Sequence, residues 1–502
     1  MRRRKRRLLG ILISIAGILI AACFLGVLIY TEMIPTKYMI LAGAVLLVLL
    51  LGGAFLVWDA RRHIRFWIGA VLHVLLALVL IVGGFYIFQT RNTLSDISEV
   101  GMDAAQIEVY VDADNDAVSV GDLRDGTFGV LKDLDRANTN AVVQQLEEEF
   151  GKDIEITEYE GLTELVDGLR SGETDAVLMN QAYIELFEEV EGYEHVQEEM
   201  RSVATEMVNS VTESEKSGDG TEQKESVRRV STLQSGADSD TLLVYISGID
   251  TRDKSMVARS RSDVNIVAAI NTKTRQVLLI NTPRDYYVPL SISGGIPDKL
   301  THAGIYGVDV SMETLEMLYD ISFDCYFRVN FSGFVDIIDA LGGIDVYSDY
   351  EFNSQNSPGY YFQQGLNHMD GETALVFCRE RYSFEEGDRQ RGKNQMAVVS
   401  GVINKALTPS ILTGYTSVLE AVKGSFETNI SYNRIAKLVK EQLESGGAWN
   451  VVTYSVDGTG DSQKPFSMSV PAYVMIPDQT TVDKAKQLIE QVENGESIHL
   501  DL

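Results

Sequence analysis

The sequence predicts an α/β protein with three N-terminal transmembrane helices, a small α/β accessory domain and a larger layered α/β domain. Three observations support this: long apolar runs fill the first ninety residues, alternating strand and helix patterns follow, and one polar segment interrupts them. The predicted ranges are 1–90 for the membrane anchor, 101–211 for the accessory domain, 212–239 for a flexible linker and 240–500 for the larger domain. A chain of 502 residues is long enough for two or three such domains.

The anchor is predicted from three apolar runs, Leu8–Tyr30, Tyr38–Trp58 and Phe66–Phe88. Each has the length of roughly 20 residues that a helix needs to cross a bilayer. Basic residues crowd the amino terminus and the loop Asp59–Arg65, and positively charged flanks stay in the cytoplasm. Three spans then place everything after about Gln89 outside the cell, as expected of a multi-pass cell-membrane protein.

Three side chains in apolar surroundings have two readings each. His73 lies within the third span, where a weakly polar helix–helix contact is a simpler reading than a functional intramembrane group. Cys325 and Cys378 are both extracellular and so compatible with a disulfide, but their apolar neighbours favour two buried free thiols.

Charge is distributed unevenly along the chain. The net charge is −29, yet residues 1–90 carry ten Lys/Arg and only two Asp/Glu. The remainder therefore holds 33 basic against 70 acidic residues. An acidic exterior excludes nucleic acid as a partner, because phosphate backbones require basic surfaces.

The accessory domain is predicted from alternating strand and helix patterns. Strands are expected at Thr127–Leu131 and Ile154–Glu158, and helices at Thr139–Phe150 and Leu162–Leu169, before the segment Ser171–Met179. This order resembles half of an extracellular solute-binding lobe. A spacer or interaction domain is the favoured reading, and a sensor of a small ligand is the alternative. Because no predicted phosphate-site residue lies here, we expect the domain to be dispensable for chemistry.

The segment from Thr212 to Ser239 is rich in Ser, Glu, Lys and Gly and has no apolar periodicity, which is typical of a flexible linker. Ordered structure resumes at Thr241. The predicted strands are 241–246, 264–270, 276–280, 325–330, 344–347 and 451–456, and the predicted helices are 311–320, 331–341, 370–378, 390–407, 410–423, 431–444 and 481–493. Helix 331–341 is apolar on most of its circumference, as in a core helix or in the wall of a lipid channel.

Arginines gather beside carboxylates in three short stretches, Arg261-Ser-Asp263, Pro283-Arg-Asp285 and Arg379–Gln395. Guanidinium groups fit phosphate oxygens bidentately, and carboxylates near phosphates suggest Mg²⁺. For any single stretch, a surface ion pair is the simpler reading. Three stretches within one region favour a phosphate site.

Seven motifs follow one another in the larger domain. They are Ser247–Asp250, Arg261–Asn265, Asn281–Asp285, Asp298–Ala303, Val329–Phe334, Asp339–Val346 and Arg379–Gln395. In these motifs the chain from about 241 to 500 resembles the LytR-CpsA-Psr family, and within it the capsule-associated CpsA-type members. The resemblance implies an α/β/α layered domain with a mixed central sheet. It also implies an Mg²⁺-dependent phosphotransferase that moves a capsular or wall glycopolymer from an undecaprenyl-pyrophosphate carrier to peptidoglycan.

The resemblance further implies a role for individual residues and a set of partners. Asp250 and Asp263 match metal-associated acids, and Asp388 and Arg391 match catalytic positions close to the reacting phosphate. The implied pyrophosphate-binding residues are Arg261, Arg284, Lys299, Arg379, Arg381 and Gln395. The implied partners are the polyprenyl-pyrophosphate-linked polysaccharide, peptidoglycan, the membrane and capsule assembly proteins.

Several alternatives remain open at this level. The outer part is compatible with a membrane sensor or regulator of capsule synthesis that binds a lipid-linked intermediate, or with a lipid pyrophosphatase that uses water as acceptor. His302 is compatible with a general base, although a hydrogen-bonded structural histidine is the favoured reading. The role of Thr301, where many relatives have asparagine, is open. On a helix, Arg391 and Gln395 would share one face.

Overall fold

The computed structural model describes most of the chain. The described residues are 2–31, 35–58, 63–97, 104–209, 239–249, 259–408, 418, 422, 424–498 and 500. Asp250, nearly all of the predicted linker and most of the predicted helix 410–423 lie outside them. The chain divides into two compact units, of which the first holds residues 1–99, 407–423 and 430–448.

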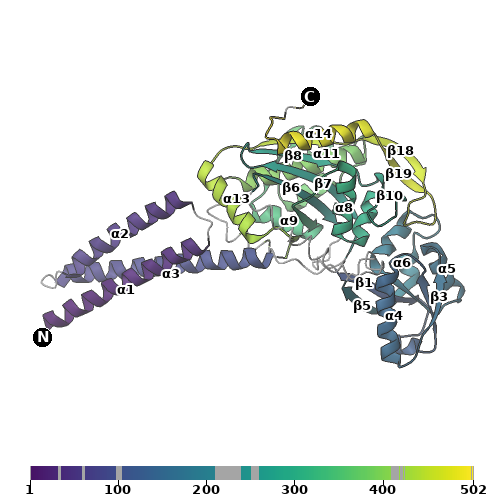
Figure 1. The fold of residues 1–502 in the computed structure, drawn as a ribbon, viewed down its shortest axis with the longest axis horizontal. Coiled ribbons are helices and arrows are strands. Elements are labelled where there is room, and N and C mark those ends of the chain that lie inside the picture. The colour runs from purple at the N-terminus through teal and green to yellow at the C-terminus, as the bar shows by residue number, and fades with distance from the viewer. Residues whose placement is uncertain are drawn as a thin grey trace, which may run out of the picture. The chain divides into compact units, whose positions relative to one another are not determined.

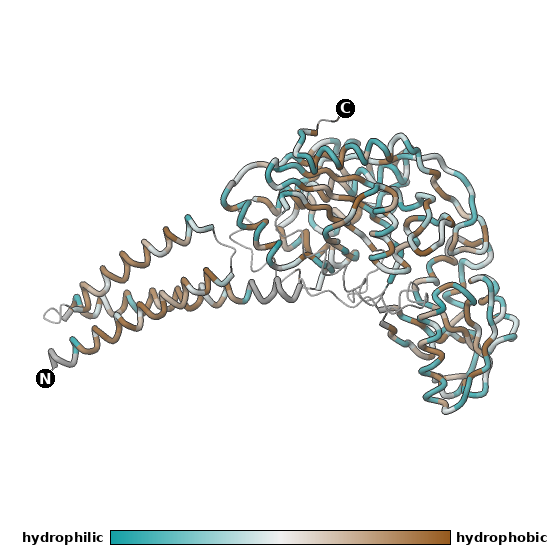
Figure 2. Tube along the Cα trace, in the orientation of Figure 1, coloured by the Kyte–Doolittle hydropathy of each residue, from teal (hydrophilic) through white to brown (hydrophobic). Residues whose placement is uncertain are grey.

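The first unit contains the three predicted anchor helices, α1 (Arg2–Tyr30), α2 (Thr36–Trp58) and α3 (His63–Ile97), together with α13 (Tyr432–Ser445). The three anchor helices are long and apolar enough to cross a membrane, which confirms the predicted spans. Figure 2 shows their mostly hydrophobic course, and many of their large apolar side chains are exposed. Large apolar side chains that face outward along a whole helix are more stable in contact with lipid than in contact with water.

His73 of α3 lies between the anchor helices and not on their outer surface. The ring is buried and lies against Gly17 of α1 and Gly53 of α2, where a larger side chain would collide with it. His73 Nδ1 is 2.9 Å from the Gly69 carbonyl oxygen one turn earlier. These contacts are those of a packing residue between small neighbours.

The second unit begins with the accessory part, a five-stranded sheet in the order β3-β2-β4-β1-β5. Its elements are β1 (Ala104–Asp112), η1 (Val120–Leu123), β2 (Thr127–Leu131), α4 (Arg136–Phe150), β3 (Glu155–Tyr159), α5 (Leu162–Ser171), β4 (Ala176–Asn180), η2 (Gln181–Glu189), α6 (Val196–Glu199) and β5 (Met200–Asn209). Strands β3, β2 and β4 are parallel, and β1 runs antiparallel between β4 and β5. Helix α4 covers one face, and α5 with η2 covers the other. Strands β1 and β5 had not been predicted.

The larger α/β part of the second unit is built on a six-stranded mixed sheet in the order β16-β11-β6-β7-β8-β17 (Figure 1). Its strands are β6 (Thr241–Ile249), β7 (Ser262–Asn271), β8 (Gln276–Asn281), β11 (Cys325–Asn330), β16 (Phe426–Thr428) and β17 (Asn450–Ser455). The helices are η5 (Leu300–Tyr306), α8 (Val308–Tyr319), α9 (Phe331–Ala340), α10 (Gly371–Arg379), α11 (Asp388–Ala406) and α14 (Gln479–Glu493). Four two-stranded sheets complete it: β9 (Tyr287–Pro289) with β10 (Pro297–Lys299), β12 (Ile344–Ser348) with β15 (Gly365–Met369), β13 (Phe352–Asn353) with β14 (Tyr361–Phe362), and β18 (Gly458–Gln463) with β19 (Ala472–Pro477).

Helices on both faces of the six-stranded sheet confirm the predicted α/β/α layering. Helices α8 and α14 pack on one face around Tyr245 and Leu278, and α11 packs on the other around Ala268 and Leu279. Alternate residues of each strand therefore enter opposite cores, as the pleat requires. Every predicted strand in this part is present. Cys325 in β11 and Cys378 in α10 are buried free thiols, as their apolar surroundings predicted.

Candidate active site

Asp263, a half-buried carboxylate near the start of β7, accepts hydrogen bonds from Arg284 and Thr301. Arg284 Nη1 donates to Asp263 Oδ1 at 3.0 Å, and the Thr301 hydroxyl donates to the same oxygen at 3.3 Å. Burial alone would raise the pKa of Asp263, but the charges of Arg284, Arg391 and Arg261 outweigh it and lower that pKa. Asp263 is therefore ionised at neutral pH, and Thr301 orients it.

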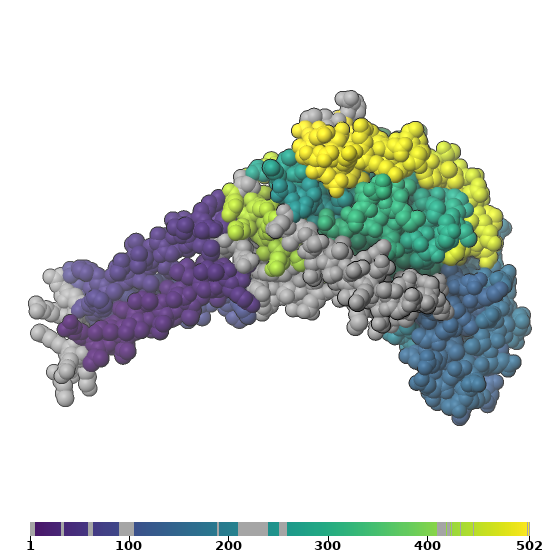
Figure 3. Space-filling model, in the orientation of Figure 1, coloured from purple at the N-terminus to yellow at the C-terminus, as the bar shows by residue number. Residues whose placement is uncertain are grey.

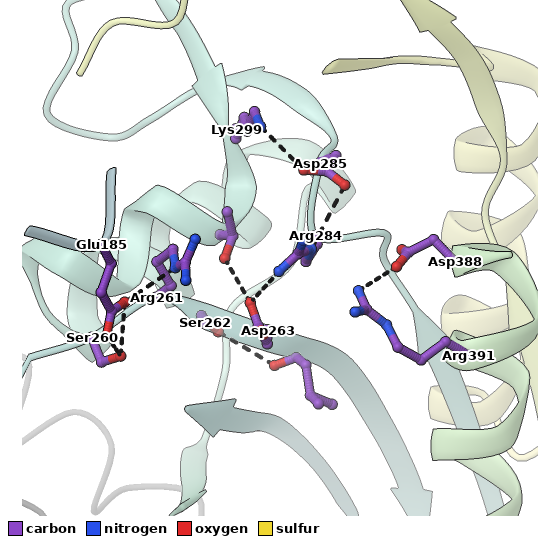
Figure 4. A network of polar contacts seen from close by, with 12 residues as sticks. Glu185, Ser260, Arg261, Ser262, Asp263, Arg284, Asp285, Lys299, Asp388 and Arg391 are labelled. Carbon is purple, nitrogen blue, oxygen red and sulfur yellow. Dashed lines mark hydrogen bonds and ion pairs between the residues drawn. The ribbon is translucent and has the colours of Figure 1, made fainter. Parts of the chain in front are cut away.

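The turn after β8 continues the network outward from Asp263 (Figure 4). Arg284 Nε lies 3.7 Å from a carboxylate oxygen of Asp285, and the buried Lys299 Nζ lies 3.5 Å from the other oxygen. In the sequence Thr282-Pro-Arg-Asp285, the cation Arg284 and the anion Asp285 are consecutive residues. The second cation, Lys299, is the last residue of β10. Buried charges of this kind persist only when they are paired.

Helix α11 supplies the third part of the site from its first turn. Asp388, the first residue of α11, forms an ion pair with Arg391. The charge of Arg391 acts on Asp263 and that of Asp388 acts on Arg284, which places this pair beside the first cluster. A carboxylate in the first turn also suits the helix dipole.

A glycine allows α11 to approach the sheet at this point. A Cβ on Gly392 would lie 2.3 Å from the side chain of Asn281, at the end of β8. A larger residue would require the Asn281 side chain to shift, so Gly392 lets α11 lie close to β8. Arg391 and Gln395 both lie on this helix and are both buried, in line with the predicted spacing.

Arg379 and Arg381 flank the end of α10 and contact aromatic rings. The Arg379 guanidinium lies 4.5 Å from the centre of the Phe331 ring, and that of Arg381 lies 4.6 Å from the Tyr382 ring. Arg379 is exposed and Arg381 is half-buried. Within the described residues, no hydrogen bond or ion pair joins these two arginines or Gln395 to the Asp263 network. Arg381 Nη2 donates to the Tyr382 hydroxyl at 2.5 Å, and no described carboxylate forms an ion pair with either guanidinium group.

Glu380, between these two arginines, was not predicted to matter and is fully buried. One carboxylate oxygen accepts the backbone N–H groups of Arg381, Tyr382 and Ser383, at 2.9–3.1 Å. The other accepts the Ser354 hydroxyl at 2.5 Å. Glu380 therefore fixes the loop that presents both arginines. The sequence gives only a weak indication of this role, which is the position of Glu380 between two arginines.

The sequence model of the LytR_cpsA_psr family matches residues 200–490, which is more than half of the chain. The chain belongs to the LytR-CpsA-Psr family. This match covers the entire Asp263 network, the arginine loop and α11.

Relatives within the family carry transferase names. A Bacillus cereus (strain AH820) protein named polyisoprenyl-teichoic acid–peptidoglycan teichoic acid transferase TagU is 36% identical over 203 residues, which are 40% of this chain and 65% of the relative. An Enterococcus faecalis (strain ATCC 700802 / V583) protein of the same name is 33% identical over 221 residues, 44% of this chain and 71% of the relative. The chain thus spans slightly less than two thirds of the first relative.

Solved structures also resemble this chain. Bacillus subtilis TagV is 26% identical, with a TM-score of 0.44 over 52% of this chain and 100% of TagV. Protein gbs0355 from Streptococcus agalactiae is 25% identical, with a TM-score of 0.44 over 54% of this chain and 92% of that one.

The structure of this LytR-CpsA-Psr protein contains one contact at the candidate site that the family resemblance does not predict. Glu185 of η2, in the accessory part, accepts a hydrogen bond from Arg261 Nε at 3.1 Å and one from the Ser260 hydroxyl at 3.3 Å (Figure 4). Ile305 of the larger α/β part also belongs to the core around α5 and η2. The accessory part therefore touches a predicted pyrophosphate ligand, which its sequence alone does not reveal.

This contact predicts the behaviour of Glu185→Gln. A phosphate must compete with Glu185 for Arg261, and a partly exposed ion pair contributes about 0.5–1 kcal/mol. The variant should therefore bind inorganic pyrophosphate about two- to fivefold more tightly, as measured by isothermal titration calorimetry on the full chain. Glu149→Gln, an exposed carboxylate of the same part, should leave the affinity unchanged. Weaker binding by Glu185→Gln would instead mean that Glu185 positions Arg261.

His302 of η5 is a structural residue in this LytR-CpsA-Psr protein, as favoured from sequence. The ring is fully buried, and Nδ1 lies 2.7 Å from Asp298 Oδ1 and 2.8 Å from Ser467 Oγ. Asp298 also accepts the Ser467 backbone N–H at 2.9 Å. The three side chains tie η5 to the segment before β19, and the complete burial of His302 is unsuited to a general base.

Asp263 is the described carboxylate best suited to a divalent cation. Among the described residues, no group of three His, Cys, Asp or Glu side chains is arranged to hold a metal. Mg²⁺, however, commonly takes one or two carboxylates and the oxygens of a phosphate substrate. Both hydrogen bonds that Asp263 accepts within the described residues reach Oδ1, so Oδ2 is available to a cation. Asp263 therefore offers one oxygen that a cation could share with a phosphate ligand.

Proposed function

We propose that this protein transfers a glycopolymer, capsular or of another wall type, from a polyprenyl-pyrophosphate carrier to peptidoglycan outside the cell. The main support is the charge pattern of the site. Its inner cations are each paired with a carboxylate: Arg261 with Glu185, Arg284 with Asp263, Lys299 with Asp285, and Arg391 with Asp388. Among the described residues these pairs leave the inner network without net charge, so we propose that Arg379 and Arg381 supply the positive charge that binds an anionic pyrophosphate.

In the proposed mechanism, Arg379 and Arg381 hold the outer phosphate oxygens, and Arg284 and Arg391 face the phosphorus that is attacked. A peptidoglycan hydroxyl forms a new P–O bond to the sugar-side phosphorus. The P–O bond to the bridging oxygen breaks, and the carrier leaves as a lipid monophosphate. Charge on the departing phosphate grows in this step, so fixed guanidinium groups stabilise the transition state more than the ground state.

Asp388 is our candidate for the group that accepts the hydroxyl proton. Its side chain is 30% exposed, against 15% for Asp263 and 12% for Asp285, so an incoming acceptor reaches it most readily. The ion pair with Arg391 keeps the carboxylate turned toward the inner network (Figure 4). After transfer, the same arginine faces the new phosphodiester.

We propose that the lipid chain of the carrier binds along helix α9. Its side chains Phe331, Phe334, Val335 and Ile337 are only partly buried, which is unusual for so apolar a helix. Phe331 also carries the Arg379 guanidinium on its ring. A polyprenyl chain along α9 would therefore place its pyrophosphate beside Arg379.

Mg²⁺ belongs to this proposal, with Asp263 and Asp250 as its protein ligands. The ion would offset the charge of the pyrophosphate oxygens. We expect an excess of chelator to lower the transfer rate at least about 100-fold, and added Mg²⁺ to restore it. Asp263→Asn should raise the Mg²⁺ concentration needed for half-maximal rate by about tenfold or more. An undiminished rate in chelator would contradict the metal requirement.

The function is tested with the full chain in detergent, a lipid-linked polysaccharide and peptidoglycan fragments. Transfer requires two products in equal amounts, the lipid monophosphate and polysaccharide covalently attached to peptidoglycan. Lipid phosphate without attached polymer would identify a pyrophosphatase. Tight binding without either product would support the regulator reading and overturn the proposed transfer.

A further inference from the structure

An exposed aromatic ring lies on the hairpin formed by β18 and β19. Tyr473 of β19 is 55% exposed, although its neighbours along the strand, Ala472 and Val474, are buried. Figure 3 shows the yellow C-terminal segment that contains this hairpin at the surface of the second unit. The sequence predicts neither strand, and the proposed mechanism uses neither. A single exposed aromatic side chain is common, so its surroundings decide whether it has a role.

The hairpin is bound to the two segments that contribute acids to the candidate site. On the side of the turn after β8, the Met475 backbone N–H donates to the Asp285 carbonyl oxygen at 2.7 Å. On the side of α11, Arg389 Nη2 donates to the Gly458 carbonyl oxygen at 2.6 Å, and Arg389 Nε lies 2.7 Å from Asp457 Oδ1. Arg389 directly follows the first residue of α11. The hairpin is thus fixed beside the site by backbone and side-chain contacts.

These contacts bring the Tyr473 ring close to the reacting groups of the proposed mechanism. Partial burial, followed by the charges of Asp285 and Asp388, raises the pKa of Tyr473, and the charge of Arg389 opposes this. Asp388 is the candidate acceptor of the proton from the attacking hydroxyl. A molecule that brings its hydroxyl to Asp388 therefore has its neighbouring groups within reach of the ring.

One edge of the ring rests against the backbone of β18. A Cβ on Gly460 would lie 2.9 Å from Tyr473 Cε2 and 3.1 Å from its hydroxyl oxygen. Gly460 pairs with Met475 and Ser462 pairs with Tyr473, so Gly460 lies diagonally across the hairpin from the ring and on the same face. The glycine therefore supports the ring without a side chain of its own, and more than half of Tyr473 stays open to a ligand.

A supported, exposed tyrosine ring is suited to a sugar. The face of the ring carries the negative part of the aromatic quadrupole. The C–H bonds on one side of a pyranose ring are apolar and weakly positive, so the two flat surfaces stack. Strand β18 runs beside the ring, and Thr459, Ser462 and Gln463 on it are exposed. Their hydroxyl and amide groups can donate to and accept from sugar hydroxyls.

We propose that Tyr473 is the platform on which a sugar ring of the peptidoglycan acceptor stacks, so that the glycan strand presents a hydroxyl to Asp388. This inference rests on the proposed transfer reaction and adds the acceptor site to it. The donor is held by Arg379 and Arg381 on the loop after α10, so different elements of the larger α/β part bind the two substrates.

Binding is tested by isothermal titration calorimetry on the full chain in detergent, with a neutral β-1,4-linked tetrasaccharide of N-acetylglucosamine. The parent should bind it with Kd of about 1 mM or lower. Tyr473→Ala should weaken binding at least about fivefold, because a stacked ring contributes on this order. Tyr473→Phe keeps the ring and should stay within about twofold of the parent. No binding by the parent at about 10 mM, or equal weakening by Ala and Phe, would overturn the proposal.

Tyr347→Ala is the matched control. Tyr347 is 61% exposed and lies on β12 of the same part. Strand β12 meets α11 at Gly401, where a Cβ would lie 2.9 Å from the Asp345 carbonyl oxygen, and this position is roughly 20 Å along the helix from Asp388. The control should bind the tetrasaccharide as the parent does. Equal losses in Tyr347→Ala and Tyr473→Ala would overturn the proposal.

Transfer kinetics separate the two sugar-bearing substrates. Tyr473→Ala should raise KM for peptidoglycan fragments at least about fivefold and leave KM for the lipid-linked polysaccharide within about twofold. A rise in KM for the lipid-linked polysaccharide alone would place the donor on the ring and overturn the acceptor assignment. If the parent binds the tetrasaccharide through Tyr473 but transfers no polymer, the proposed function fails while the glycan site is supported.

Discussion

Replacing Arg379 or Arg381 with alanine should lower kcat/KM for polymer transfer at least about 100-fold, with little change in thermal stability. The inner cations of the site are already paired with carboxylates, so these two guanidinium groups supply most of the uncompensated positive charge for a pyrophosphate. Arg379 is exposed and Arg381 is half-buried, and both lie on aromatic rings. Side chains so placed contribute little to folding.

Lys393→Ala is the matched control for this pair. Lys393 lies on α11 and pairs with Glu386, and its removal changes the net charge by the same amount. It should leave kcat/KM within about twofold of the parent. Arg381→Lys should recover only part of the lost rate, because an ammonium cannot bind phosphate bidentately. Parent-like rates in both alanine variants, at unchanged melting temperature, would refute their role.

Glu380→Ala should lower the free energy of unfolding by about 3 kcal/mol or more and should abolish transfer as well. The substitution leaves four backbone N–H groups, those of Asn356, Arg381, Tyr382 and Ser383, and the Ser354 hydroxyl without their buried acceptor. Each such loss costs about 1–3 kcal/mol. The loop that carries Arg381 would then no longer be fixed. Chemical denaturation and transfer assays on the same preparations measure both effects.

Two comparisons separate this effect from a general one. Glu372→Ala makes the same change at an exposed site on α10 and should alter stability by no more than about 0.5 kcal/mol. Glu380→Gln keeps one carbonyl acceptor and should be intermediate. If Glu380→Ala matched Glu372→Ala in stability, the organising role of Glu380 would be refuted.

The pH dependence of Glu380 follows from its lowered pKa. Burial raises that pKa, but the Ser354 hydroxyl and the backbone N–H groups of Asn356 and Ser383 lower it further than burial raises it. A carboxylate with a lowered folded pKa stabilises the protein above its ordinary pKa of about 4.3 and loses that contribution as pH falls through the folded value. The stability difference between the parent and Glu380→Gln should therefore shrink in acid.

Sequence alone was sufficient for the features that depend on local pattern. Three apolar runs determined the anchor helices, because a bilayer fixes how many apolar residues a span needs. Periodicity located β6, β7, β8, β11, β12 and β17 and the helices α8, α9, α10 and α11, since each element buries one face. It did not locate η5 or the short strands β9, β10 and β13–β16, which have too few residues to show a period. Motifs located most of the charged side chains that the structure joins around Asp263, because they lie in short stretches where arginine stands beside carboxylate.

Only the tertiary structure decided which side chains meet across long stretches of chain. Glu185 reaches Arg261, and Ile305 packs into the core around α5 and η2, although both contacts join the accessory part to the larger α/β part. Glu380 has a structural role rather than a phosphate- or metal-binding one, because its buried carboxylate accepts hydrogen bonds from the backbone of its own loop. Periodicity and motif spacing describe neighbours along the chain, whereas these contacts depend on how two separately folded sheets pack against each other.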